Sequence, residues 1–237
     1  MIRGILFDKD GTLFDFNATW RGVMQAALAA LAPGDPARAD AMALAVGYDP
    51  ATGSFVAGSA IVAGSTADVA QAWAPFLPDR PLKALEREIN SYSTGAGSGT
   101  LAPASADLPA LLDVLRGMGL ALGVATHDSE AGARHHLEEV GALDRFDFIA
   151  GYDSGHGLKP GPGMVLAFCA HTGLAPSEVA MIGDSLHDLG AGRSAGAGLV
   201  VGVLTGPAVE EELSPMADLV LPSIEALPGA LARMRGA

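Results

Sequence analysis

The sequence predicts an α/β fold in which a parallel sheet carries helices on both faces and a helical domain is inserted after the first strand. Two observations predict it. Through the second half of the chain, short apolar runs alternate with segments of helical spacing, a pattern typical of parallel sheets. Between the first apolar run and this half, apolar residues recur at helical spacing. Together these features predict a Rossmann-like core with an inserted α-helical cap domain.

The expected strands are short apolar runs. The first, residues 5–7, stops at Asp8 before a turn at Gly11. The strands expected after it are residues 120–125, 146–150, 179–182, 199–204 and 218–221. Helices are expected between them at residues 129–140 and 162–171, from residue 186 onward, and after the last strand.

Residues 15–96 are predicted to form the cap domain, and residues 1–14 and 97–237 the core. Apolar residues at helical spacing indicate a first helix over residues 20–31. Glycine-rich residues 95–99 are suited to a hinge, with a second hinge near residues 14–15. No strand is expected in the cap. Its further helices are expected at residues 37–46, 66–76 and 82–92.

The composition is that of a globular protein, with 49% of the 237 residues hydrophobic and 17% charged. A formal net charge of −13 argues against nucleic-acid binding, because such a surface repels polyphosphate backbones. A small anion remains a suitable substrate, since a bound cation reverses the field inside a cleft. The single cysteine, Cys169, is expected to be buried. With neither a signal peptide nor a membrane-spanning run, the expected location is the cytoplasm.

Polar residues follow several of the expected strands, and this topology gathers them at one edge of the sheet. Three or four carboxylates placed together repel each other unless a hard divalent cation neutralises them. Oxygen ligands without a Cys/His cluster favour Mg²⁺ over Zn²⁺. The sequence therefore predicts a magnesium site. The polar residues gathered at this edge are Asp8, Asp10, Thr126, Lys159, Asp184 and Asp188, and the four aspartates are the candidates for the metal site.

Four short motifs resemble, in this order, the signatures of the haloacid dehalogenase superfamily. They are residues 8–12 (DKDGT), Thr126 within VATH, Lys159-Pro160, and residues 183–188 (GDSLHD). All four fall at expected strand ends or loops, and the likeness extends over essentially the whole chain. The overall pattern is most similar to the phosphoglycolate phosphatase-like subgroup, whose members carry a helical cap.

The resemblance implies a Mg²⁺-dependent phosphatase that acts on a small phosphorylated metabolite. The sequence leaves both a monomer and a homodimer open. Asp8 is then the nucleophile and Asp10 the general acid and base. The phosphoryl group would be contacted by Gly11, Thr12, Thr126, His127 and Lys159. Mg²⁺ would be held by Asp8, by the backbone carbonyl of Asp10 and by Asp184, with Asp188 contributing directly or through water.

Other functions remain as alternatives. Asp10 argues against a true dehalogenase, which lacks this second aspartate, and Thr12 favours hydrolysis over a phosphomutase. A phosphomutase of the same superfamily and a non-catalytic phospho-receiver or regulatory module stay open. A receiver lacks a cap and orders its acidic pair differently.

Several charged and aromatic residues are predicted to lie outside the chemistry. Lys9 is expected to point away from Asp8 and Asp10, because side chains alternate along an extended segment. Trp20 is expected in the core of the cap and Arg21 in solvent. The histidines expected at the surface are His135, His136, His156, His171 and His187.

Overall fold

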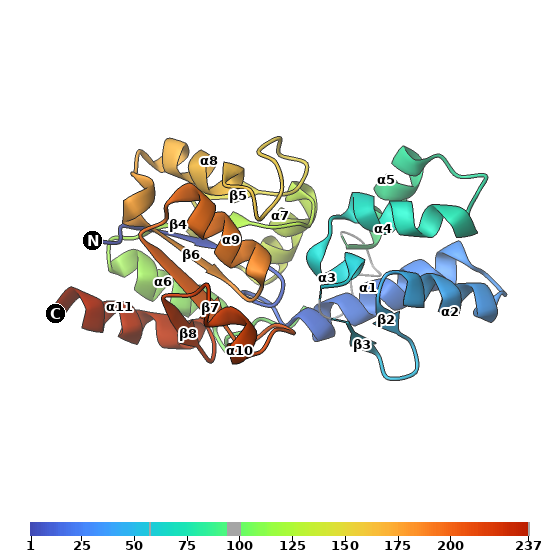
Figure 1. The fold of residues 1–237 in the computed structure, drawn as a ribbon, viewed down its shortest axis with the longest axis horizontal. Coiled ribbons are helices and arrows are strands. Elements are labelled where there is room, and N and C mark those ends of the chain that lie inside the picture. Colours follow the sequence, from blue (N-terminus) through green and yellow to red (C-terminus); the bar gives the residue numbers. More distant parts are fainter. Residues whose placement is uncertain (57, 94–100, 237) are drawn as a thin grey trace.

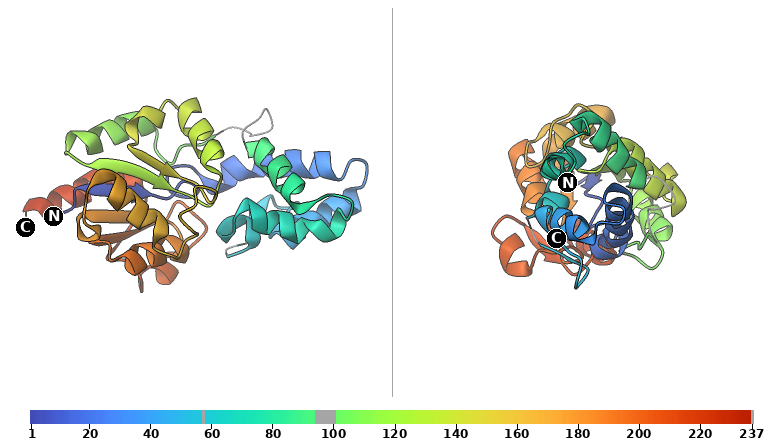
Figure 2. Two further views of the ribbon diagram at one scale, coloured as in Figure 1. Left: turned by 90° about the horizontal axis from the view of Figure 1, so that it is seen from above. Right: turned by 90° about the vertical axis from the view of Figure 1, so that its right-hand side faces the viewer.

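The computed structural model describes residues 1–56, 58–93 and 101–236, which form two lobes lying end to end (Figure 1). The sheet lobe holds a parallel sheet with the strand order β5-β4-β1-β6-β7-β8. Both termini lie at its end remote from the other lobe (Figure 2). The strands are β1 (Gly4–Phe7), β4 (Ala121–Ala125), β5 (Phe148–Ala150), β6 (Val179–Gly183), β7 (Leu199–Val203) and β8 (Leu219–Leu221).

Strand β1 lies inside the sheet between β4 and β6, so that Phe7 is level with Val124 and Ile182. The residues that follow these three strands therefore emerge side by side at the carboxyl edge. After β1 the chain adds β4 and β5 on one side, then crosses β1 to place β6 on the other. Open parallel sheets bind their ligands at such a switch point.

Helices cover both faces of the sheet, as the sequence predicts (Figure 2). One face is covered by α6 (Leu108–Gly117), α7 (Glu130–Glu139) and α11 (Leu227–Gly236). The other is covered by α8 (Gly163–Thr172), α9 (Leu186–Ala195) and α10 (Glu210–Leu213). Short 3-10 turns occur at Ala74–Phe76, Leu143–Arg145, Pro176–Glu178 and Ile224–Ala226.

The second lobe, residues 16–93, is called the helical lobe and has a hydrophobic core of its own around Met24 and Trp73. Its first helix begins at Asp15, whose side chain accepts the backbone N–H of Ala18. The elements of this lobe are α1 (Phe16–Leu31), α2 (Pro36–Ala45), β2 (Tyr48–Asp49), β3 (Ser54–Phe55), α3 (Ala60–Ala63), α4 (Thr66–Trp73) and α5 (Leu82–Ser93).

The structure confirms the predicted sheet and the four longer helices of the helical lobe. The expectation of no strand in this lobe is wrong: β2 and β3 form an antiparallel pair, but two residues each are too few to show a period. The hinge expected at residues 95–99 and the boundary between residues 96 and 97 lie outside the described residues. In the described part of the chain, no helix combines the length and apolarity needed to cross a membrane.

Candidate active site

Asp8 is placed at the centre of the carboxyl edge by the end of β1. Its backbone N–H still donates to the carbonyl of Ile182 (2.8 Å), so the nucleophile candidate is fixed to the sheet. The chain then turns sharply: the carbonyl of Lys9 accepts the N–H groups of Leu13 and Phe14, and Gly11 has φ +88°. Only glycine adopts such a φ readily, so this turn depends on Gly11.

Asp184 and Asp188 enter the same edge from the β6–α9 connection. Strand β6 ends at Gly183, and Ser185 caps α9. Asp188, in the first turn of that helix, accepts from the N–H (3.1 Å) and the hydroxyl (2.6 Å) of Ser185. This reciprocal cap holds the Asp188 carboxylate against the sheet edge.

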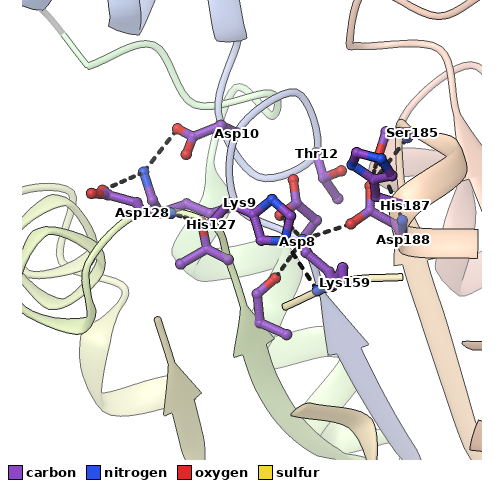
Figure 3. Close-up of polar contacts among 12 residues, drawn as sticks. Asp8, Lys9, Asp10, Thr12, His127, Asp128, Lys159, Ser185, His187 and Asp188 are labelled. Atoms are coloured by element: carbon purple, nitrogen blue, oxygen red, sulfur yellow. Dashed lines mark hydrogen bonds and ion pairs between the residues drawn. The ribbon is translucent and has the colours of Figure 1, made fainter. Parts of the chain in front are cut away.

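Lys159 joins these carboxylates into one buried cluster (Figure 3). Its Nζ lies 2.6 Å from Asp8 Oδ1 and 2.6 Å from Asp188 Oδ1, and donates to the carbonyl of Ala125 at 2.9 Å. Carboxylate oxygens of Asp8, Asp184 and Asp188 lie within 4.8 Å of one another, and all three residues are buried. One ammonium group therefore faces three carboxyl groups.

Burial and mutual repulsion shift the pKa values of this cluster. Burial raises the pKa of Asp8 to about 7, despite the opposing attraction of Lys159. Burial also raises the pKa of Asp184 well above its ordinary value, and repulsion from Asp8 and Asp188 adds to this. Burial lowers the pKa of Lys159, but Asp188 and Asp8 together outweigh that effect and hold it above its usual value.

The donor set fits a hard divalent cation. Three carboxyl groups against one ammonium leave two negative charges in excess when all are ionised. Repulsion among the carboxylates adds to burial in raising the pKa values of Asp8 and Asp184. A divalent cation among carboxylate oxygens removes it, and oxygen-only ligands suit Mg²⁺. The predicted metal ligands Asp8, Asp184 and Asp188 are thus brought together.

Glycines and hydroxyl groups surround the Asp184 carboxylate. Thr12 donates its hydroxyl to Asp184 Oδ1 (3.2 Å). A Cβ at Gly11 would lie 2.3 Å from Asp184 Oδ2, and one at Gly206 would lie 1.7 Å from it. Thr205, beside Gly206, donates to the carbonyl of Gly11 (2.6 Å). Residues 205 and 206 are not among the predicted site residues, although they follow β7 at the same sheet edge.

The predicted phosphate-binding residues differ in whether their hydrogen-bond donors are available. The hydroxyl oxygen of Thr126, after β4, accepts the N–H of Asp128 (3.0 Å). The hydroxyl hydrogen of Thr126 is therefore still available for donation. The N–H of Gly11 donates to Phe14 and that of Thr12 to Lys9. Those two residues therefore shape the turn around Asp184, and their N–H groups point into the turn.

His127 links the two lobes. One ring nitrogen, Nδ1, donates to the carbonyl of Ala63 in the helical lobe (2.9 Å), and Nε2 accepts the backbone N–H of Lys159 (3.1 Å). His187 donates to the same carbonyl (3.2 Å). Burial lowers the pKa of His127 to about 4, with repulsion from Lys159 acting the same way. The expectation that His187 is a surface residue is wrong, because it is half-buried and lines the cavity.

Asp10 is held by a second buried cluster, beside the first (Figure 3). The expected orientation of Lys9 is wrong: its Nζ lies 2.8 Å from Asp10 Oδ1, because the chain leaves the extended conformation after β1. Lys9 also contacts Asp128 Oδ2 (3.2 Å) and His136 Nδ1 (3.0 Å). His136 is fully buried, which corrects its predicted surface position. It shares one face of α7 with Gly132, Ala133 and Leu137, a spacing that marks it as buried.

A cavity of about 60 Å³ lies between these clusters and the helical lobe. Trp20 lines it from α1 and also packs in the lobe, as predicted. Arg21 is exposed and donates to the carbonyl of Gly53. His156 and His171 are exposed, and Cys169 is buried, as predicted.

Comparison with known proteins agrees with this architecture. A phosphoglycolate phosphatase of Shigella boydii is 32% identical over an alignment 257 positions long, which covers 97% of this chain and 92% of the relative. The N-acetylmuramic acid 6-phosphate phosphatase of Pseudomonas aeruginosa is 29% identical over 198 residues, covering 82% of this chain and 79% of the relative.

Solved structures share the fold. A predicted phosphoglycolate phosphatase from Haemophilus somnus superposes with a TM-score of 0.71 at 20% identity, covering 97% of this chain and 98% of its own. The L-2-haloacid dehalogenase of Xanthobacter autotrophicus superposes with a TM-score of 0.64 at 19% identity, covering 99% of this chain and 100% of its own. The sequence model of the haloacid dehalogenase-like hydrolase family matches residues 2–196 of this chain. The chain belongs to the haloacid dehalogenase-like hydrolase family.

Proposed function

We propose that this chain is a Mg²⁺-dependent phosphatase that hydrolyses a small phosphate monoester, either phosphoglycolate-like or a sugar phosphate, through an aspartyl-phosphate intermediate. The observation that carries the proposal is the buried contact of Lys159 with Asp8 and Asp188, at the switch point of the sheet. It combines a fixed carboxylate nucleophile with a cation for the phosphoryl oxygens. The names of the two curated relatives, both phosphatases, support the same reaction class.

The reaction divides into two displacements on phosphorus. Asp8 attacks the phosphorus in line while the ester oxygen leaves with a proton from Asp10, which forms the aspartyl phosphate and the free alcohol. Water then gives a proton to Asp10 and attacks the phosphorus, releasing phosphate and restoring Asp8. The Asp10 side chain is 11% exposed and lines the cavity, so it is accessible to both alcohol and water.

Lys159 and Thr126 are assigned to the phosphoryl oxygens. Lys159 exchanges its contact with a carboxylate for one with the phosphoryl group and offsets the charge that develops there. Asp8, Asp184 and the carbonyl of Asp10 would hold Mg²⁺, which supplies charge neutralisation at the reacting phosphoryl group. Both oxygens of Asp188 already accept from Lys159 and Ser185, which favours an indirect contribution from this residue.

The helical lobe acts as a cap in this proposal. Contacts of His127 and His187 with Ala63 hold it over the cavity, where it excludes bulk water during phosphoryl transfer. Residues 15–96 are proposed as the cap domain and residues 1–14 and 97–237 as the core. The proposed location is the cytoplasm, in keeping with a single buried cysteine.

The test is phosphate release from a panel of small phosphate esters, with Mg²⁺ and with excess chelator. Release that requires Mg²⁺ and is lost in Asp8→Asn but kept in Asp40→Asn, an exposed aspartate of α2, is the expected result. Asp10→Asn should slow both half-reactions, and mass spectrometry should detect phosphate on Asp8. Mg²⁺-dependent transfer with no phosphate release would instead indicate a mutase, and a long-lived aspartyl phosphate a receiver module.

A further inference from the structure

The wall that the helical lobe contributes to the cavity is almost entirely apolar. Among the lining residues of the lobe that the structure describes, the polar side-chain groups are the hydroxyls of Ser65 and Thr66, at the start of α4, and the indole N–H of Trp20. The carboxylates and ammonium groups all come from the sheet lobe, so the cavity has one charged wall and one apolar wall. The apolar wall consists mainly of Phe16, Trp20, Ile61, Val62, Val69 and Ile89.

No cation of the helical lobe lines the cavity among the residues that the structure describes. Residues 15–100 contain five lysines and arginines and no histidine, and none of residues 57 and 94–100 is charged. All five are engaged or exposed elsewhere: Arg21 with the Gly53 carbonyl, Arg38 with Asp35, Arg80 with Glu88, Lys83 with Glu86, and Arg87 in solvent.

The backbone of this lobe does not replace the missing cation. Helix α4 begins at the cavity, and the N–H groups at a helix N-terminus bind anions. Here a carboxylate already occupies that end, because Asp68 Oδ2 accepts from the N–H and the hydroxyl of Ser65, each at 2.7 Å. Its charge repels a second anion at the same place.

The cations of the sheet lobe are also committed. Lys159 lies against Asp8, where the phosphoryl group must sit for in-line attack. Lys9 is enclosed between Asp10 and Asp128. His127 is neutral, because its Nε2 accepts the N–H of Lys159. His187 also lines the cavity, and its Nδ1 donates to the Ala63 carbonyl. Among the described residues, an anionic group on the alcohol portion of a substrate would therefore meet no lysine or arginine in this cavity other than Lys159.

We propose that the substrate is a phosphate monoester whose alcohol portion carries no anionic group and presents an apolar face to the helical lobe. This inference rests on the proposed phosphatase activity and narrows its substrate class. It separates this chain from the substrates named for its relatives, since phosphoglycolate and N-acetylmuramic acid 6-phosphate each carry a carboxylate besides the phosphate. Against the apolar wall such a carboxylate loses its hydration and gains no cationic partner.

The test compares two esters of the same size, phosphoglycolate and its amide, phosphoglycolamide, by kcat/KM for Mg²⁺-dependent phosphate release. The amide should be hydrolysed at least about 100-fold more efficiently, because its binding does not require an unpaired carboxylate to be buried against the apolar wall. Equal efficiencies, or a preference for phosphoglycolate, would overturn the inference and leave the phosphatase assignment intact. No release from either ester or from p-nitrophenyl phosphate would overturn the phosphatase assignment itself.

A cation added to the apolar wall should weaken the preference for the amide. Val62 is half-buried, lines the cavity and lies outside the main core of the helical lobe, so Val62→Lys is the variant of choice. Its ratio of phosphoglycolate to phosphoglycolamide hydrolysis should rise at least about tenfold, by pairing of the carboxylate with the new ammonium. Leu44→Lys, at a residue of α2 that is 63% exposed, adds the same charge outside the cavity and should leave the ratio unchanged. An equal rise in both variants would contradict a role for the wall.

Discussion

Lys9 Nζ lies 3.2 Å from Asp128 Oδ2, and neither side chain has any exposed surface. The same ammonium group lies 2.8 Å from Asp10 Oδ1. Burial lowers the pKa of Lys9, but Asp10 and Asp128 outweigh it and raise the pKa above its ordinary value. A buried cation thus stands between the proposed general acid and a carboxylate with no assigned part in the reaction.

Lys9→Met should destabilise the protein strongly at neutral pH. It leaves the buried Asp128 without its cation, and breaking a buried ion pair from one side costs about 3–5 kcal/mol. Burial already raises the pKa of Asp128, and loss of Lys9 raises it further. Protonation of Asp128 then becomes favourable in the folded state, so the deficit should shrink as the pH falls from 7 to 5. Urea unfolding of both proteins at the two pH values measures this.

The control for this prediction is Lys83→Met. The Lys83 side chain is 83% exposed and pairs with Glu86 on the same helix, so its removal should cost less than about 0.5 kcal/mol. A Lys9→Met protein as stable as the wild type at pH 7 would show that the buried pair contributes nothing. A deficit that stays constant with pH would contradict the part assigned to Asp128.

Lys159→Met should remove most of the activity. The variant keeps an unbranched side chain one atom shorter but withdraws the only ammonium group among Asp8, Asp184 and Asp188 in the described structure. Loss of one such group usually lowers kcat by about 10²- to 10³-fold. Single-turnover kinetics at saturating Mg²⁺ give the rate of the phosphoryl-transfer step directly. Less than a fivefold loss, with Lys83→Met as reference, would exclude Lys159 from the transition state.

The sequence predicted the sheet well because its strands are buried on both faces. Such strands appear as uninterrupted apolar runs, and β6 (Val179–Gly183) and β7 (Leu199–Val203) are buried along their whole length. The positions of Asp8, Asp184 and Lys159 follow from the same topology, since parallel strands deliver their carboxyl ends to one edge. The helix α6 was missed, although Leu108, Leu112 and Leu115 carry its spacing.

The second cluster could not be predicted by the alternation rule, which holds only where the backbone stays extended. After Phe7 the chain turns at Gly11, so Lys9 and Asp10 do not lie on opposite sides of a strand. The contact between His127 and Ala63 depends on how the two lobes pack, and no local pattern encodes it. Residues 64 positions apart meet there only through the tertiary fold.

His127 should make stability fall in mild acid. Its pKa in the folded protein is about 4, below the ordinary value of 6.5, so the unfolded chain binds a proton first as the pH falls. The free energy of unfolding is therefore unaffected by the titration of His127 above pH 6.5. Between pH 6.5 and pH 4 the titration of His127 lowers it by at most about 3 kcal/mol. Other groups titrate in this range, so the measured quantity is the difference in Tm between the wild type and His127→Gln. That difference should narrow towards pH 4.5; a constant difference would contradict the shifted pKa.

Gly206→Ala should weaken Mg²⁺ binding while leaving the fold intact. The added methyl group would lie 1.7 Å from Asp184 Oδ2, so the carboxylate must leave its present position. Displacing a group that orients a metal ligand commonly lowers metal affinity about 10- to 100-fold. The Mg²⁺ concentration for half-maximal phosphate release should rise by that factor, and the increase of Tm on adding Mg²⁺ should diminish. Gly117→Ala is the matched control, because nothing lies within 4 Å of its added methyl group. An unchanged Mg²⁺ requirement in Gly206→Ala would mean that Asp184 does not hold the metal.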